Sequence, residues 1–193
     1  PYREIRFEGE AQPLLYSMDN QRVVLFGTLS KTVLPGFRIG WIIAPKEIIE
    51  KLVVAKQSTD ICTPVFYQAV VVKYFQKGLF EKNLGKTIDL YRTKRDHMLS
   101  CFEKYMPNGV SWTRPEGGLF LFVTLPEGYD TTELFHVALK NDVAFVIGEA
   151  FHCDGTGKNT MRINFSFMDE EKTEEGVKRL AKAIEEMFAK GVK

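Results

Sequence analysis

A single lysine stands among hydroxyl residues near the start of the chain. Lys31 is flanked by Thr28, Ser30 and Thr32, and Arg38 follows seven positions later. Hydroxyls, backbone N–H groups and a guanidinium together can bind a phosphate group. An amine held beside another positive charge is more easily kept neutral, which is the form that attacks a carbonyl carbon to give a Schiff base. These residue types therefore combine a possible phosphate site with a possible amine nucleophile.

The elements on either side predict where this lysine lies. Residues 23–26 are a short apolar run typical of a buried strand, and residues 39–44 are a second run, typical of a strand buried on both faces. Loops beyond strand ends often carry ligand sites. On spacing alone Lys31 could equally be a solvated surface charge. A Walker A phosphate loop is excluded, because Ser30 stands where that motif requires glycine.

The segment around Lys31 resembles the cofactor-lysine motif of fold-type I pyridoxal-phosphate aminotransferases of class I/II, and most of all their aminoadipate and multi-substrate branch. The family motif reads Ser/Thr-x-Ser-Lys followed by Pro-Gly-x-Arg-x-Gly-Trp, and this chain has Thr-Leu-Ser-Lys followed by Pro-Gly-Phe-Arg-Ile-Gly-Trp. The resemblance implies that Lys31 binds pyridoxal 5'-phosphate covalently. It also implies that Thr28, Ser30 and Arg38 hold the cofactor's phosphate.

Two further segments resemble the same family. Tyr2 takes the place of a tyrosine that donates a hydrogen bond to the cofactor's ring oxygen, and the aspartate of that segment would precede the first residue. Residues 160–167 alternate apolar and polar side chains as a half-buried strand does, and they resemble the family segment Met-Arg-Leu-Asn-Phe-Ser. There the arginine binds the substrate α-carboxylate in a bidentate pair, so the resemblance gives that role to Arg162. Without the family resemblance, Arg162 would be interpreted as a surface charge and Tyr2 as an ordinary loop residue.

Two loops leave alternatives open. The glycine pair at 117 and 118 resembles the family segment Pro-x-Gly-Gly-x-Phe, which lies near the substrate, but it could equally be a plain hairpin turn. The family usually has Pro-Gly where this chain has Ile147 and Gly148. The following His152, Cys153 and Asp154 could suggest a nucleophile, although a loop near the mouth of the site is the simpler interpretation.

Composition and charge argue against several functions. The 193 residues carry 26 basic and 25 acidic side chains, and the net charge of +1 creates no field for nucleic acid. No apolar run approaches the roughly 20 residues that span a bilayer, and no signal-peptide pattern is present. Three widely spaced cysteines argue against a disulfide framework and favour a reducing cytoplasm, and with no CxxC or HxxxH pattern they predict no metal site.

The expected architecture is α/β, in two parts. The resemblance implies the C-terminal part of a large cofactor-binding domain, the end of a mostly parallel sheet with helices, followed by a small α+β domain. We place the remnant of the large domain at 1–65, connecting helices at 66–106 and the small domain at 107–193. Family members are about twice this length, so the chain resembles their C-terminal half. Alone it is expected to expose an apolar surface and to be inactive, whereas the complete protein is expected to be a homodimer.

Periodicity and capping residues predict five helices, the first of which begins near Pro45 and carries Ile48, Ile49, Leu52, Val53 and Lys56 at helical spacing. Thr63 as N-cap and Pro64 at the first helical position predict a helix to about residue 77, and apolar residues at steps of three and four predict a long one over 79–106, with a gap at Arg95. A short helix is expected over 131–140, and a last one after Asp169.

The predicted function is transfer of an amino group between an α-amino acid and a 2-oxo acid, with glutamate and 2-oxoglutarate as one expected pair. Two alternatives keep the same motifs. One is an aminotransferase-like sensor domain of a winged-helix transcription regulator, and the other is a pyridoxal-phosphate-dependent lyase of the same fold. The amino donor stays open among glutamate, aminoadipate, aromatic and branched-chain amino acids, because side-chain pockets in this family draw on residues outside this chain.

Overall fold

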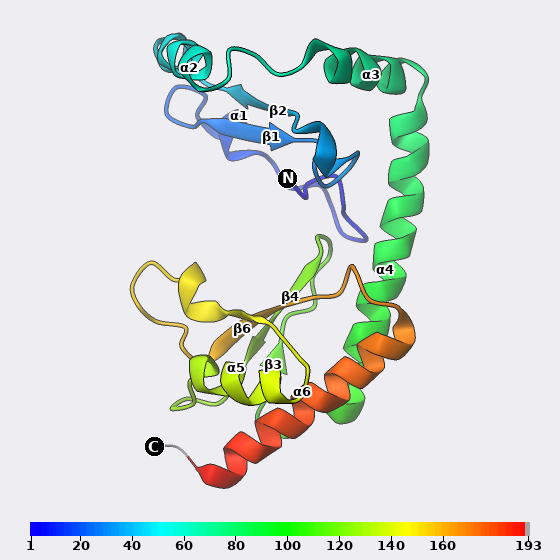
Figure 1. The fold of residues 1–193 in the computed structure, drawn as a ribbon, viewed down its shortest axis with the longest axis vertical. Helices are drawn as coiled ribbons and strands as arrows, with labels where there is room; N and C mark the ends of the chain where they lie inside the picture. The colour runs from blue at the N-terminus through cyan, green and yellow to red at the C-terminus, as the bar shows by residue number, and fades with distance from the viewer. Residues whose placement is uncertain (192–193) are drawn as a thin grey trace. The chain divides into compact units, whose positions relative to one another are not determined.

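The computed structural model describes residues 1–191, which form two compact units that meet between Asp89 and Leu90 (Figure 1). Both units combine helices with a sheet, which confirms the predicted α/β class. The division falls inside one long helix, within the region 66–106 that the sequence assigned to connecting helices. The finer domain limits at 65 and 106 stay a prediction.

The first unit is built on one antiparallel strand pair, in which Thr28 lies opposite Gly40. The loop that carries Lys31 and Arg38 joins these two strands. The elements of this unit are α1 (Leu15–Met18), β1 (Leu25–Thr28), the short 3-10 helix η1 (Pro35–Phe37), β2 (Gly40–Ile43), α2 (Lys46–Thr59), α3 (Val65–Gln76) and the start of α4 (Leu79–Tyr105).

The prediction that residues 39–44 form a strand buried on both faces is wrong for the described residues. All four residues of β2 are exposed, including Trp41 and Ile43. The reason is that β1 and β2 are the only strands of this sheet within residues 1–191, so no further strands flank the pair. Together with Val65 and Phe66 on α3, which are 71% and 73% exposed, they form the apolar surface that the sequence led us to expect.

The start of α3 differs from the prediction by one position. Pro64, not Thr63, is the N-cap residue, because its ψ of 122° keeps it outside the helix, which begins at Val65. No side chain caps this terminus. The helix gives way at Gly78 as expected, and the φ of +64° at this glycine is a backbone conformation that side-chain-bearing residues rarely adopt.

The second unit places helices against a four-stranded antiparallel sheet of order β3-β4-β6-β5. In Figure 1, α5 and α6 lie together below β4 and β6, and the two helices pack against each other. The elements that follow α4 are β3 (Ser111–Trp112), β4 (Phe120–Thr124), α5 (Thr131–Lys140), β5 (Val146–Ile147), the 3-10 helix η2 (Gly148–Phe151), β6 (Thr160–Asn164) and α6 (Glu170–Lys190).

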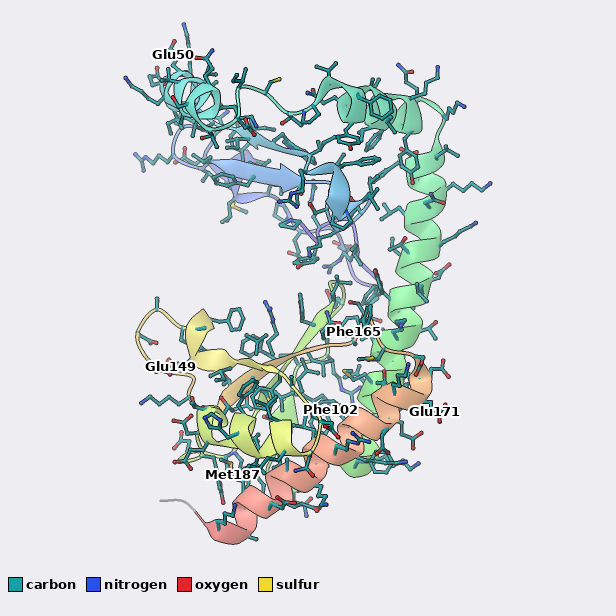
Figure 2. The ribbon with its side chains drawn as sticks, in the orientation of Figure 1. Glu50, Phe102, Glu149, Phe165, Glu171 and Met187 are labelled. Atoms are coloured by element: carbon teal, nitrogen blue, oxygen red, sulfur yellow. The ribbon has the colours of Figure 1, made fainter. Side chains whose placement is uncertain are left out.

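Alternation along the central strands separates the two faces of this sheet. Leu121, Val123 and Met161 are fully buried, and with Phe102 and Phe165, labelled in Figure 2, they belong to the core. Each such side chain contributes about 1.5–3 kcal/mol of transfer free energy on burial. The intervening residues of β4 and β6 occupy the opposite, half-buried face of the sheet.

Two strands are shorter than the sequence predicts. The alternation over residues 160–167 predicts a strand to Phe167, but β6 ends at Asn164 and Phe167 is 82% exposed. The Asn164 side chain accepts a hydrogen bond from the Ser166 backbone N–H at 2.9 Å. Such a local bond competes with the ladder and ends the strand. The strand expected over 143–147 pairs only at Val146 and Ile147.

The gap at Arg95 in the apolar stripe of α4 has a structural cause. Arg95 is only 5% exposed, and its Nη1 donates to the Pro115 carbonyl oxygen at 2.7 Å while its Nε donates to Asp96 at 2.8 Å. Buried arginines require such partners. Arg95 therefore ties α4 to the loop that leads into β4.

The last helix begins as predicted. The Asp169 side chain accepts a hydrogen bond from the Lys172 backbone N–H at 2.8 Å, and this bond lowers the pKa of Asp169. The helix then buries one face against the sheet, as its apolar spacing predicts. The buried residues are Thr173, Val177, Leu180, Ala181, Ala183, Ile184 and Met187.

An ion-pair network on α6 predicts a pH-dependent contribution to stability. The Tyr105 hydroxyl donates to Glu174, and Lys178 lies 3.2 Å from the same carboxylate, which together lower the pKa of Glu174 from 4.5 to about 2. Because the folded pKa is depressed, the stabilisation is complete above 4.5 and is lost as the pH falls toward about 2. The thermal midpoints of the wild type and Glu174→Gln should therefore differ at neutral pH and converge near pH 2. Glu186→Gln on the same helix should show no such convergence, and parallel curves for Glu174→Gln would contradict the assignment.

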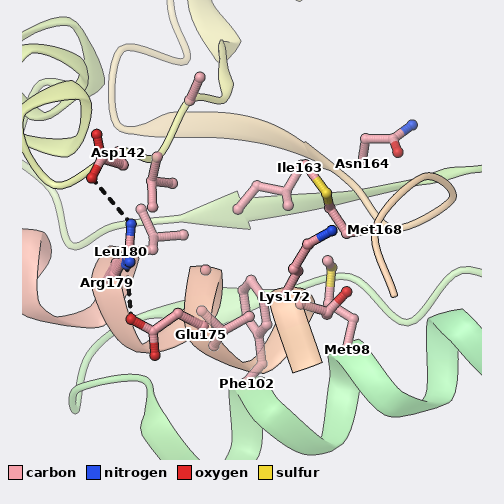
Figure 3. Close-up of a pocket in the computed structure, with 15 residues that line it drawn as sticks. Met98, Phe102, Asp142, Ile163, Asn164, Met168, Lys172, Glu175, Arg179 and Leu180 are labelled. Carbon is pink, nitrogen blue, oxygen red and sulfur yellow. Dashed lines mark hydrogen bonds and ion pairs between the residues drawn. The ribbon is translucent and has the colours of Figure 1, made fainter. Parts of the chain in front are cut away.

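A cavity of about 330 Å³ lies between α4, β6 and α6 (Figure 3). Phe102, Ile163 and Leu180 give it apolar walls, and Arg179 joins Asp142 at 3.2 Å and Glu175 at 2.8 Å at its rim. The cavity lies on the helix-covered side of the sheet. None of the residues predicted to bind cofactor or substrate lines it.

Candidate functional site

The Thr28 hydroxyl forms hydrogen bonds with both ends of the loop between β1 and β2. Thr28 Oγ1 accepts a hydrogen bond from the Ser30 backbone N–H at 3.1 Å. The same oxygen lies within donating distance of Ser30 Oγ at 3.0 Å and of the Ile39 carbonyl oxygen at 3.2 Å. Because Thr28 contacts both arms of the loop, it fixes their separation and places the Ser30 hydroxyl beside its own.

Lys31 follows these hydroxyls and lies near the N-terminal tyrosine. Its Nζ is 6.0 Å from the centroid of the Tyr2 ring, at the limit of a cation–π contact. Tyr2 and Lys31 are 29 positions apart in the sequence. Only the family resemblance predicted from sequence that these two side chains would lie near each other. The fold of the first unit therefore brings together the amine and the phenol that the sequence singles out.

Arg38 occupies a strained position in the same loop. Its φ of 54° is left-handed, a conformation that non-glycine residues adopt infrequently and at a cost of about 1–3 kcal/mol. It ends η1, and its Nη1 donates to the Pro35 carbonyl oxygen at 3.3 Å. Arg38 also lines a groove of about 590 Å³ that includes Gly27 and Trp41. Such strain is most often retained at functional sites.

Gly27 allows the Trp41 indole to lie against β1. The two residues face each other across the strand pair, and a Cβ at Gly27 would lie 2.0 Å from Trp41 Cε2. Any side chain there would displace the indole. Packing against Trp41 therefore requires glycine at position 27.

Together, the loop presents a donor set of defined chemistry. Two hydroxyls and one guanidinium can bind a phosphate ester, and one amine can bind a carbonyl carbon covalently. Thr28 and Ser30 are half-buried, whereas Lys31 and Arg38 are exposed. This set fits a phosphorylated aldehyde, because a phosphate and a reactive carbonyl are the two functional groups that it can bind.

Arg162 lies on the central strand of the second unit. It is paired with Phe122 on β4 and with Val146 on β5, so strands flank it on both sides. Its Nε is buried without a hydrogen-bond partner in the described part of the chain. A half-buried arginine on a central strand is held more rigidly than one on a loop. The structure therefore supports an anchor for an anion more than a solvated surface charge.

Aromatic rings surround Arg162, and sequence reasoning missed them. The guanidinium carbon lies 4.1 Å from the Phe120 ring centroid and 4.6 Å from that of Phe151. Phe122 meets Phe151 edge-on at 5.5 Å. Phe120 and Phe122 occupy alternate positions of β4, and this spacing was the feature of the sequence that could have placed aromatic rings on one face of the sheet. Phe151 could not be found in that way, because it comes from η2.

The predicted site residues thus form two groups. Tyr2, Thr28, Ser30, Lys31 and Arg38 belong to the first unit, and Arg162 belongs to the second. The individual roles of these residues stay predictions.

The loop after η2 is organised by its own hydrogen bonds. Thr156 Oγ1 lies 3.1 Å from His152 Nδ1 and donates to Asp154 at 2.6 Å, and hydrogen bonds from Thr156 lower the pKa of Asp154. Gly157 packs against the His152 ring at a φ of +76°, where a Cβ would lie 2.2 Å from that ring. Cys153 is exposed, and no bond to His152 is seen among residues 1–191. This arrangement favours a closed loop over an activated nucleophile.

Residues 1–191 contain no group of three or more His, Cys, Asp or Glu side chains placed to hold a metal ion. Over the same residues, no helix is both long and apolar enough to cross a bilayer.

Comparison with known proteins identifies a family. The sequence model described as aminotransferase class I and II matches residues 2–180. Over 191 residues the chain is 48% identical to aromatic-amino-acid aminotransferase 1 of Thermococcus litoralis, covering 98% of this chain and 46% of that protein.

Solved structures show the same likeness. The multiple substrate aminotransferase of Thermococcus profundus matches with a TM-score of 0.92 and 47% identity, over 98% of this chain and 47% of that one. A Pyrococcus horikoshii kynurenine aminotransferase, solved in complex with PMP, matches with a TM-score of 0.91 and 47% identity, over 97% of this chain and 46% of that one. The chain therefore spans about half the length of the relatives that it matches.

Proposed function

The chain belongs to the class I and II aminotransferase family, and on that premise we propose that the complete protein transfers an amino group between an α-amino acid and a 2-oxo acid. Members of this family depend on pyridoxal 5'-phosphate. The observation that carries the proposal is the donor set of the β1–β2 loop, with the Lys31 amine beside the Tyr2 ring. That set fits the phosphate and the aldehyde of this cofactor.

Lys31 has two tasks in this proposal. Its Nζ would hold the aldehyde carbon of the cofactor, and with substrate bound its amine would serve as the base for the proton at the substrate α-carbon. A base tethered within reach of that proton gains from proximity. The bound cofactor supplies the electron sink that makes the α-proton removable.

The other predicted site residues of the first unit would hold the cofactor in place. Thr28 and Ser30 offer two adjacent hydroxyls, and Arg38 offers a guanidinium that can bind a phosphate in a bidentate manner. Tyr2 would donate a hydrogen bond to the ring oxygen of the cofactor. These residues would thus hold the cofactor at two separate points.

Arg162 binds the substrate α-carboxylate. A guanidinium makes two parallel hydrogen bonds to a carboxylate, a geometry that the point charge of lysine cannot reproduce. Holding the carboxylate in one plane fixes the orientation of the substrate α-carbon. The rigid central strand β6 suits this role, since misplacement of about 1 Å can cost a hundredfold in rate.

We propose glutamate and 2-oxoglutarate as one substrate pair. The names of the matched relatives support a broad donor range, since they include an aromatic-amino-acid aminotransferase and a multiple substrate aminotransferase. Those names do not favour the transcription-regulator alternative. Aminoadipate, aromatic and branched-chain amino acids are the other proposed donors, with the order of preference left to measurement.

A donor and acceptor screen of the complete protein tests this function. The expected result is transfer of nitrogen from glutamate to a second 2-oxo acid, followed through the cofactor's absorbance and by product analysis. Substrate breakdown without conversion of the acceptor would favour the lyase alternative. A cofactor spectrum that changes on binding, with no turnover of any pair, would favour the sensor alternative.

We also propose that the complete protein is a cytoplasmic homodimer. The exposed apolar side chains of β2 and α3 support burial against further protein, and the three free cysteines among the described residues support a reducing compartment. The screen should be accompanied by sedimentation under the assay conditions, where a monomer would contradict the dimer.

A further inference from the structure

Arg162 lies against two aromatic rings. Its guanidinium carbon lies 4.1 Å from the centroid of Phe120 and 4.6 Å from that of Phe151. Phe120 comes from the neighbouring strand β4, whereas Phe151 is the last residue of η2. Two elements distant in sequence therefore supply aromatic contacts to one cation, and each contact is attractive because the ring face carries partial negative charge.

This arrangement limits how an anion can reach Arg162. A guanidinium offers hydrogen bonds only in its own plane, and its two faces offer none. Nε is buried and has no acceptor within the described residues, so the edge that contains it is closed to solvent. The edge formed by the two Nη atoms is the part left to bind a ligand, and it presents two parallel N–H groups.

We propose that Phe120 and Phe151 form an aromatic clamp that fixes the plane of the Arg162 guanidinium, so that the substrate carboxylate binds end-on across the two Nη atoms. The inference rests on the proposed role of Arg162 as the carboxylate anchor. Phe120 and Phe151 are positioning residues in this proposal, since they act through Arg162. The clamp determines the angle of the carboxylate and hence the orientation of the α-carbon.

Phe151 is the better residue for a test, because its loss should leave the fold intact. It is 46% exposed, and its ring contacts Phe122 and Arg162 in the described part of the chain. Phe151→Leu keeps an apolar side chain and removes the π face. Phe151→Tyr keeps the ring and serves as the rescue variant. Phe167→Leu is the matched control, since Phe167 is 82% exposed in the same unit.

The first measurement is made without cofactor or turnover. A proton that lies against two aromatic rings has its resonance displaced by the ring currents, so the Arg162 Nε–H signal should move in Phe151→Leu, stay close to its position in Phe151→Tyr and be unchanged in Phe167→Leu. The signal is assigned by its absence from Arg162→Lys. An unmoved signal in Phe151→Leu would overturn the clamp.

The second measurement uses the complete, cofactor-loaded protein. Phe151→Leu should raise the KM for the amino acid about five- to tenfold, in keeping with the strength of a partly desolvated cation–π contact. Phe151→Tyr should restore the wild-type KM. A corresponding amine without the carboxylate should bind the wild type and Phe151→Leu equally, which a general loss of structure would not produce.

Failure of the clamp and failure of the proposed function give different patterns. If Arg162→Lys weakens binding of the amino acid but not of the amine, while Phe151→Leu changes neither, the clamp is wrong and the anchor stands. If Arg162→Lys also leaves both unchanged, Arg162 is not the carboxylate anchor and the inference fails with it.

Discussion

Replacing Lys31 with alanine is expected to abolish covalent cofactor binding and to slow amino transfer by a factor of about 10²–10⁴ or more. The factor is that of removing a positioned general base, and loss of the covalent attachment adds to it. The hydroxyls of Thr28 and Ser30 and the guanidinium of Arg38 stay in place, since their hydrogen bonds do not involve the lysine. The variant should therefore bind pyridoxal phosphate reversibly.

Dialysis followed by absorbance spectroscopy separates the two kinds of binding. Wild-type protein should keep the absorbance of the covalently bound cofactor, and Lys31→Ala should lose it. Lys51→Ala is the matched control, because Lys51 is an exposed lysine on α2 in the same unit. A Lys31→Ala protein that regains that absorbance after mixing and keeps it through dialysis would contradict the assignment.

An arginine at the same position distinguishes charge from nucleophilicity. Lys31→Arg keeps a cation near the Tyr2 ring, which lies 6.0 Å from Nζ in the wild type. A guanidinium stays protonated and forms no Schiff base under these conditions. Lys31→Arg should thus be as inactive as Lys31→Ala while retaining its charge. Activity in Lys31→Arg above that of Lys31→Ala would mean that the charge of Lys31 matters more than its nucleophilicity.

Local sequence was sufficient to predict several elements of this protein. The long apolar stripe predicted α4 almost to its last residue, and Asp169 was correctly identified as the N-cap of α6. These features depend on neighbours within one or two turns, so a single sequence contains the necessary information. The loop with Lys31 and Arg38 was also located from local sequence, but the strand before it is β1 at Leu25–Thr28 and not a buried strand at 23–26, and Phe26 on it is 64% exposed.

Features that depend on distant neighbours could not be predicted. The exposure of β2 follows from how many strands and layers cover it, which its own apolar residues do not specify. Arg95 interrupts an apolar stripe because the Pro115 carbonyl lies opposite it, and the contact of Phe151 with Arg162 requires η2 to fold back beside β6. Each of these contacts joins residues from different elements, and only tertiary structure brings them together.

Arg162→Lys is expected to lower kcat/KM for amino acids by about 10- to 100-fold. The substitution keeps the positive charge but replaces two parallel charge-assisted hydrogen bonds with one, and each such bond contributes about 1.5–3 kcal/mol. The planar contact with Phe120 and Phe151 is also lost, since an ammonium group does not stack as a guanidinium does. Arg162→Ala removes the charge as well and should lower kcat/KM further.

The effect of Arg162→Lys should be confined to the substrate. Cofactor absorbance and its retention on dialysis should match the wild type, because the predicted phosphate-binding residues belong to the other unit. Arg114→Lys is the control, since Arg114 is an exposed arginine of the second unit paired with Glu103. An unchanged kcat/KM in Arg162→Lys would exclude a bidentate carboxylate contact at this residue. A loss shared equally by amino acids and by amines without a carboxylate would show that Arg162 acts on structure, not on the carboxylate.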